Sequence, residues 1–124
     1  MRYASTILYV PDTAAAVEFY GRAFGLEPGF TAPGGSYATL GGESAGLAFA
    51  SYEVAPQVDG TRDGPGGFEV WLETDDVPAA YERAVEAGAE AVAEPTEKPW
   101  GQTVAYVRDL NGTLVELGEP VSDA

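Results

Sequence analysis

The sequence predicts an α+β fold made of two copies of one βαβββ module. A β-rich run, a capping Asp, a helical stretch and a closing Gly occur in the same order twice. Asp12 to Gly25 and Asp75 to Gly88 are both 13 residues apart, so the repeat period is 63 residues. Three further strand-like runs follow each helix, and a segment rich in Gly and Pro, residues 53–67, separates the copies. Such an internal repeat decides the fold more strongly than any single element does.

The first module is expected to span residues 1–52. Its opening strand, residues 3–10, ends at Pro11, and Asp12 then provides an N-cap for a helix over residues 13–24. Gly25 is the expected C-cap. Glycine-rich turns separate the remaining strands, which we place at residues 27–32, 35–40 and 45–51.

The second module is expected to span residues 68–119, so that the chain forms one domain of two modules joined by the linker 53–67. Its helix, about residues 77–87, has a side that we expect to be buried, formed by Ala80, Tyr81, Ala84 and Val85. Its strands are expected at residues 68–74, 90–94, 102–108 and 113–118. The last two form a hairpin, whose turn 109–112 contains Asn-Gly, a pair that accepts the positive φ angles of tight turns.

Composition excludes several classes of function. Apolar residues make up 45% of the 124 residues, which supports one globular domain. The net charge of −14 disfavours nucleic acid as a partner, because phosphate binding needs basic side chains. No apolar run approaches the ~20 residues of a membrane helix, and no leader pattern precedes the first strand. We therefore expect a cytoplasmic protein with no membrane partner.

The sequence contains neither histidine nor cysteine. Catalytic triads that use histidine, thiolate nucleophiles and zinc sites of the His or Cys type are therefore excluded. Any metal would need oxygen ligands, which favours hard cations such as magnesium, calcium or manganese.

Two carboxylates and two tryptophans are the main candidate site residues. Glu116 is a carboxylate within an apolar strand, and alternation places Glu69 and Trp71 together on the strand face that lies away from the helix. Trp100 stands beside Gly101 and could stack on a flat ligand. The alternative is that the carboxylates are solvated or bonded to tyrosine hydroxyls, and that Trp100 only covers the core. Four other aromatics could line a cavity or simply fill the core: Tyr3, Tyr9, Tyr37 and Phe49.

The chain resembles the vicinal oxygen chelate superfamily, which includes glyoxalase I, binding proteins of the bleomycin-resistance type, fosfomycin-modifying enzymes and extradiol dioxygenases. The resemblance covers nearly the whole chain. The segments that carry it are LYVPD at 8–12, VEFY at 17–20, FGL at 24–26, AGA at 87–89, PWGQ at 99–102, VRDLNG at 107–112 and LVEL at 114–117.

This resemblance implies two curved half-sheets whose concave faces enclose a cavity. The metal enzymes of the superfamily place four ligands in it, usually with His at the first and third positions and a carboxylate at the last. The matching positions here are Ser5, Ala48, Glu69 and Glu116. Two ligands are lost and one histidine is replaced, so we expect no cofactor. The alternative is a magnesium or manganese ion on Glu69 and Glu116.

The resemblance and the residues together predict a homodimeric small-molecule binding protein of the glyoxalase/bleomycin-resistance type. Its ligand would be an aromatic or cationic compound, sequestered as in antibiotic resistance. The alternatives are a lyase, isomerase or dioxygenase-like enzyme, with Glu69 and Glu116 as acid and base or with a divalent cation, and a structural member whose partner is another protein. The predicted ligand-binding residues are Ser5, Ile7, Ala48, Glu69, Trp71, Trp100, Tyr106 and Glu116.

Overall fold

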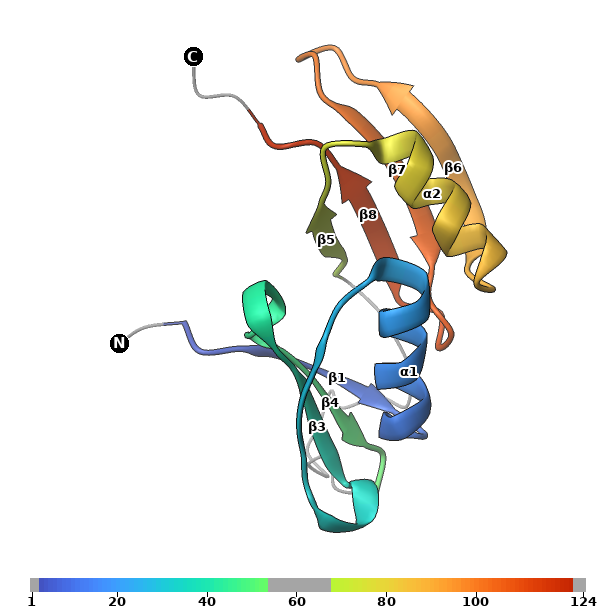
Figure 1. Ribbon diagram of the computed structural model, residues 1–124. Helices are drawn as coiled ribbons and strands as arrows, with labels where there is room; N and C mark the ends of the chain where they lie inside the picture. The colour runs from blue at the N-terminus through green and yellow to red at the C-terminus, as the bar shows by residue number, and fades with distance from the viewer. Residues whose placement is uncertain (1–2, 54–67, 122–124) are drawn as a thin grey trace. The chain divides into compact units, whose positions relative to one another are not determined.

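In each half of the chain, one helix packs against one face of a four-stranded sheet, as the computed structural model shows (Figure 1). The structure describes residues 3–53 and 68–121. The chain divides into two units, Met1–Pro65 and Gly66–Ala124, and each is described by itself. Nearly all of the predicted linker lies outside the described residues, so the predicted linker remains a prediction.

The first unit contains one helix and one sheet. The sheet has the strand order β1-β4-β3-β2, with β1 parallel to β4 and the other pairs antiparallel. Short 3₁₀ turns at residues 33–35 and 42–44 connect the later strands. The elements are β1 (Thr6–Val10), α1 (Thr13–Phe24), β2 (Pro28–Thr31), β3 (Tyr37–Leu40) and β4 (Leu47–Ser51).

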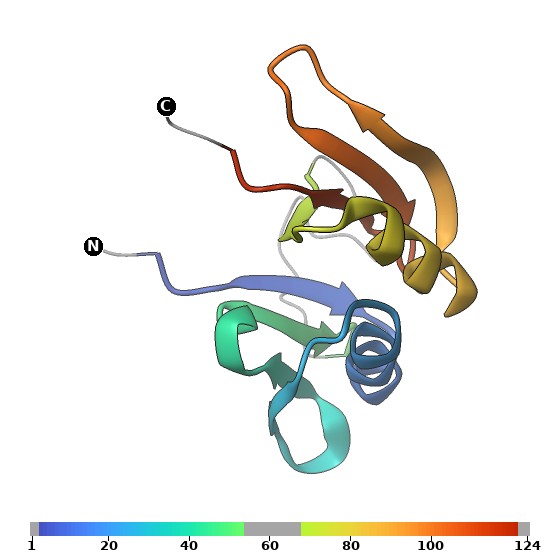
Figure 2. The same ribbon diagram turned by 45° about the horizontal axis from the view of Figure 1, so that its top comes forward.

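The second unit repeats this arrangement. Its strand order is β5-β8-β7-β6, with β5 parallel to β8 and antiparallel pairs elsewhere. The elements are β5 (Val70–Glu73), α2 (Val77–Glu86), β6 (Glu90–Glu97), β7 (Thr103–Arg108) and β8 (Leu114–Gly118). Figure 2 shows, from a second direction, α2 lying along its sheet. The predicted α+β fold with two βαβββ modules is confirmed.

Helix α1 begins at its predicted cap, Asp12, and α2 is capped by Asp76, one residue after the Asp75 of the repeat. The carboxylate of Asp12 accepts a hydrogen bond from the Ala15 N–H, and that of Asp76 accepts one from Ala79, each at 3.1 Å. These bonds satisfy backbone donors that the first turn of a helix leaves unpaired. Gly25 ends α1 in the left-handed region, with a φ of 73°, where glycine carries no Cβ penalty.

Large side chains fill the space between helix and sheet in the first unit. Tyr20 of α1 and Phe49 of β4 are both buried, with ring centroids 5.0 Å apart at an edge-to-face angle. Phe49 is therefore a core residue and does not line a cavity. Aromatic pairs in this geometry contribute about 0.5–1.5 kcal/mol beyond their burial.

In the second unit the core is built from small and β-branched residues. Ala84 of α2, Val107 of β7 and Val115 of β8 are all fully buried, and α2 contacts both strands. One expectation was wrong: Val85 is 38% exposed. Neighbouring helical residues point about 100° apart, because the helix has 3.6 residues per turn. With Ala84 directed at the sheet, Val85 is turned toward solvent.

The turn between β7 and β8 does not use the predicted Asn-Gly geometry. Among the described residues, only glycines have positive φ, so Asn111 does not, whereas Gly112 has a φ of 88°. The turn is held instead by the buried Asp109, whose carboxylate accepts the N–H groups of Asn111 at 2.8 Å and Thr113 at 2.9 Å. Asp109 thereby sets the register that brings Glu116 opposite Tyr106.

Candidate functional site

Three side chains form a row across the second sheet. Trp71 on β5 is the register partner of Glu116 on β8, and Glu116 is in turn the partner of Tyr106 on β7. Side chains alternate between the two faces of a strand. Because Val115 and Leu117 are buried on the face that α2 covers, Glu116 lies on the opposite face. We call Trp71, Glu116 and Tyr106 the Glu116 row.

Tyr106 holds the Glu116 carboxylate in place. Its hydroxyl donates a hydrogen bond to Glu116 Oε1 at 3.0 Å. Burial, this bond, and the charges of Glu116 and Glu69 raise the pKa of Tyr106 from 10.0 to about 12. Each cause favours the neutral hydroxyl over a phenolate beside carboxylates. Tyr106 therefore remains a hydrogen-bond donor throughout the physiological pH range.

Glu69 lies immediately before β5, and its charge acts on Tyr106 while the charge of Glu116 acts on it. Its pKa is raised, first by partial burial and then by the negative charge of Glu116. The nearby negative charge of Glu116 disfavours ionisation of Glu69, so the region has a surplus of negative charge that a cation would offset.

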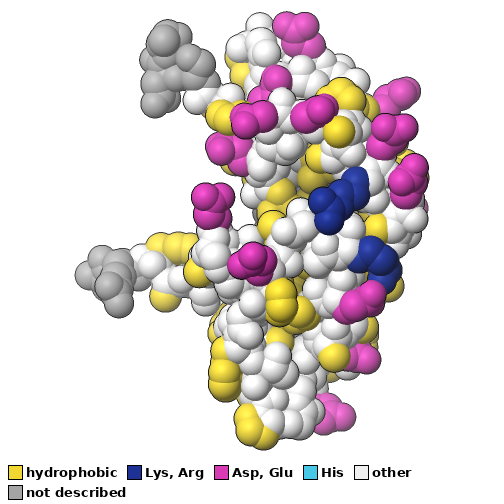
Figure 3. All heavy atoms as spheres, in the orientation of Figure 1, with side chains coloured by type: hydrophobic (Ala, Val, Ile, Leu, Met, Phe, Trp, Pro, Cys, Tyr) yellow, Lys and Arg dark blue, Asp and Glu magenta, His cyan; other side chains and the backbone are white. Residues whose placement is uncertain are grey.

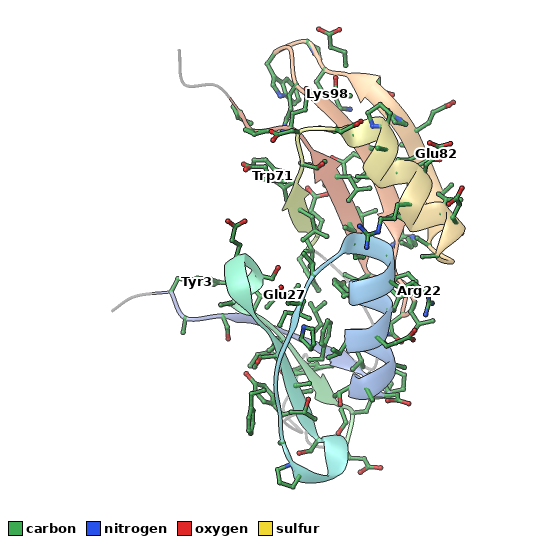
Figure 4. The ribbon with its side chains drawn as sticks, in the orientation of Figure 1. Tyr3, Arg22, Glu27, Trp71, Glu82 and Lys98 are labelled. Carbon is green, nitrogen blue, oxygen red and sulfur yellow. The ribbon has the colours of Figure 1, made fainter. Side chains whose placement is uncertain are left out.

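Trp71 offers an aromatic surface beside this charge. Its indole N–H donates to the backbone oxygen of Gly118 at 3.3 Å, and 46% of the residue remains exposed. Figure 4 shows Trp71 on β5, whereas Glu82 projects from α2. The hydrogen bond fixes the indole while part of its surface remains accessible for stacking.

A second tryptophan is anchored through a buried amide. Trp100 is 65% exposed, and its indole N–H donates to Gln102 Oε1 at 2.9 Å. Gln102 is only 8% exposed, and its Nε2 donates to the backbone oxygen of Glu119 at 2.6 Å. The sequence pointed to Trp100 but not to the role of Gln102, whose only signal was its position two residues after the tryptophan.

The predicted site residues of the first unit are of a different kind. Ile7 on β1 is the register partner of Ala48 on β4, so the structure brings these two together. Ala48 is 1% exposed and has no polar side-chain atom. Ser5 is exposed and precedes β1. None of the three supplies a charged group, so the charged chemistry among the predicted residues belongs to the second unit.

Negative charge dominates the surface. The sequence has 20 acidic and 6 basic residues, and Figure 3 shows Asp and Glu side chains spread over the visible face with few Lys or Arg. One basic residue, Arg108, shares the face of Glu116 by alternation on β7, and its guanidinium donates to the Gly112 oxygen at 2.9 Å. The field around the site favours cationic ligands.

A family model described as Glyoxalase/Bleomycin resistance protein/Dioxygenase superfamily matches residues 2–117. The chain belongs to this superfamily. An uncharacterized protein of Mycobacterium bovis is 32% identical over 94% of this chain and 82% of its own length. An uncharacterized protein of Mycobacterium tuberculosis has the same identity, with 73% of its length covered.

Solved structures of the superfamily have the same fold. TioX from Micromonospora sp. ML1 is 25% identical, with a TM-score of 0.78 over 96% of this chain and 98% of that one. A glyoxalase-related enzyme from Fulvimarina pelagi is 24% identical, with a TM-score of 0.80 over 97% and 88%. A family member from Burkholderia phytofirmans is 18% identical, with a TM-score of 0.82 over 98% and 100%.

The residues present do not fit the metal site of the superfamily's enzymes. Within residues 3–53 and 68–121, no group of three or more His, Cys, Asp or Glu side chains is arranged to hold a metal ion. Two carboxylates alone seldom complete the shell of a divalent cation, and Glu116 already accepts a bond from Tyr106.

In the same described part of the chain, no helix is both long enough and apolar enough to cross a membrane.

Proposed function

We propose that the protein binds a small aromatic cation at the Glu116 row. The single observation that carries the proposal is the row itself: a fixed carboxylate lies between a part-exposed tryptophan and a tyrosine on three adjacent strands. A binding site needs an oriented charge and a surface for the body of the ligand. Glu116 supplies the first and Trp71 the second.

The charge of the ligand follows from the carboxylates. Partial burial and then the negative charge of Glu116 raise the pKa of Glu69, so the two carboxylates form a region of negative charge. A bound cation would relieve this repulsion and gain a charge-assisted contact with Glu116. The net charge of −14 would also increase the encounter rate for cations and disfavour anions.

The aromatic character of the ligand follows from Trp71. A cation over the face of a tryptophan gains about 0.5–2 kcal/mol, and a flat ring can stack on the same surface. The indole N–H is already bonded to Gly118, so the indole offers its surface rather than a donor. A planar cation would satisfy both groups at once.

The test compares two Glu→Gln variants with the wild type, with 1-methylquinolinium as the probe in titration calorimetry. Glu116→Gln removes the charge of the row and should weaken binding about tenfold, the effect of about 1.4 kcal/mol. Glu82→Gln removes the same charge from the exposed side of α2 and should leave the affinity within about twofold. Equal affinities for wild type and Glu116→Gln would refute the proposal.

A second candidate, a metal-free isomerase or lyase, is favoured by the raised pKa of Glu69. A carboxylate with a raised pKa is a better general base near neutral pH. Glu69 would take a proton from carbon and Tyr106 would stay protonated as a donor. Accelerated deuterium exchange at the C–H bonds of hydroxyacetone, lost in Glu69→Gln, would favour this candidate over simple binding.

The metal version of this candidate has its own test. If Glu69 and Glu116 held a divalent cation, magnesium or manganese would raise the melting temperature of the wild type, and Glu116→Gln would abolish that rise. No shift with either ion would leave the metal-free candidates.

We also propose that the protein forms a homodimer. The sheet orders leave β1 and β2 at the edges of one sheet and β5 and β6 at the edges of the other. Edge strands carry unpaired backbone groups that commonly pair with another chain. Light scattering at micromolar concentration should give the mass of two chains, and a monomer mass would contradict the proposal.

A further inference from the structure

Three polar side chains converge on Gly118, the last residue of β8. A Cβ added to Gly118 would lie 2.9 Å from Glu116 Oε2, 2.9 Å from Trp71 Nε1 and 3.2 Å from Gln102 Nε2. Real Cβ atoms essentially never approach other atoms within 3.0 Å. The space that a side chain would need at this position is therefore taken by the ends of three others.

The backbone does not explain why a glycine is found here. Gly118 does not have a positive φ, unlike Gly25 and Gly112. An alanine could adopt its conformation without strain. The reason for glycine must therefore be the side chains above it.

The same short segment also anchors both tryptophans. The backbone oxygen of Gly118 accepts the Trp71 indole N–H, and that of Glu119 accepts the Gln102 amide that holds Trp100. Thr74 adds a backbone N–H to the Gly118 oxygen at 3.0 Å. The end of β8 is thus the common support of the aromatic groups and lies beside the Glu116 carboxylate.

We propose that Gly118 is a positioning residue of the aromatic-cation site. Because Gly118 has no side chain, the ends of the Glu116, Trp71 and Gln102 side chains can approach the same point. This inference rests on the proposed function and deepens it. This close approach sets the separation between the Glu116 carboxylate and the Trp71 indole. A ligand must match that separation, so Gly118 would contribute to specificity without contacting the ligand.

Gly118→Ala isolates this role, because all three short contacts are with the ends of side chains that can rotate away. The variant should fold, while Glu116 and Trp71 are displaced. Gly21→Ala is the matched control: the added Cβ there meets only the Leu26 oxygen, at an ordinary 3.5 Å. Gly21 lies in α1 of the first unit, where alanine is favoured over glycine.

Two measurements need no ligand. The chain has two tryptophans, so two indole N–H signals appear in the nitrogen–proton NMR spectrum, and Trp71→Phe assigns them. Gly118→Ala should move the Trp71 signal and speed its exchange with solvent. It should also lower the pKa of Tyr106 from about 12 toward 10.0, because the displaced Glu116 no longer accepts its hydrogen bond. If Gly118 had only a structural role, replacing it would change neither the Trp71 indole signal nor the pKa of Tyr106.

The third measurement is the affinity for 1-methylquinolinium, which should fall about tenfold in Gly118→Ala and stay unchanged in Gly21→Ala. Unchanged indole signals and an unchanged Tyr106 titration would overturn the inference, whether or not the probe binds. An unfolded Gly118→Ala would also overturn it, because the three side chains would then be unable to move aside as the inference requires. Failure of the probe to bind the wild type would refute the proposed function alone, and the two NMR measurements would still decide the role of Gly118.

Discussion

The Tyr106 hydroxyl and the Glu116 carboxylate face each other on neighbouring antiparallel strands and share a hydrogen bond of 3.0 Å. This pair gives the site a fixed carboxylate on a regular strand instead of on a loop. Sites built on strands and held by a second side chain keep their geometry better than sites on loops. The pair therefore supports the proposed binding function.

Replacing Glu116 should change the titration of Tyr106. The bond to Glu116 and its charge are two of the causes that raise the pKa of Tyr106 to about 12, so Glu116→Gln should lower that pKa, while burial keeps it above 10.0. Carbon NMR of the tyrosine rings follows the titration, and Tyr106→Phe assigns the signal. An unchanged pKa would show that the hydrogen bond is absent in solution.

The raised pKa of Tyr106 also makes stability depend on alkaline pH. The folded state holds this proton more tightly than the unfolded chain does, so the contribution is fully present below pH 10.0 and is lost as the pH rises toward about 12. Urea unfolding across this range should show a steeper loss of stability in the wild type than in Tyr106→Phe. Equal slopes would contradict the raised pKa.

Glu69→Gln should slightly stabilise the protein at neutral pH. The pKa of Glu69 is raised, so its favourable contribution exists below the unfolded-state pKa and is lost as the pH rises through the folded-state value. At pH 7 the ionised Glu69 side chain therefore slightly lowers the free energy of unfolding. The free energy of unfolding should rise by at most about 0.5 kcal/mol.

That gain should disappear once the pH falls well below 4.5, the ordinary pKa of a glutamate side chain, where Glu69 is protonated in both states. Glu82→Gln controls for the general decrease in negative charge and should show a smaller gain. A Glu69→Gln variant that is less stable than the wild type at pH 7 would mean that Glu69 is held by a favourable partner.

The hairpin turn gives a prediction that concerns stability alone. Asp109→Ala removes the acceptor of two backbone N–H groups, those of Asn111 and Thr113. Leaving such donors unpaired costs about 1–3 kcal/mol, so thermal unfolding should occur several degrees lower. Asp109→Asn keeps a carbonyl oxygen in the same place and should restore most of the loss. Equal melting temperatures for all three proteins would show that Asp109 does not stabilise the turn.

Most of the fold was predictable from the sequence because its signals are local. The caps Asp12 and Gly25 mark the ends of α1, and the repeat marks the second module. Alternation also placed Glu69 and Trp71 on one strand face. The role of Gly118 was not predictable, because it depends on which side chains converge there. Asp109 was likewise hidden, since Asn-Gly beside it suggested another turn.

The most direct test of the central claim is a calorimetric comparison of 1-methylquinolinium with quinoline, its uncharged analogue of similar shape, at pH 8 and low salt. The Glu116 row predicts that the cation binds at least tenfold more tightly, the effect of about 1.4 kcal/mol from one charge-assisted contact. The difference should shrink as added salt screens the carboxylates. Equal affinity for the two compounds, or tighter binding of quinoline, would contradict a site organised around the Glu116 carboxylate.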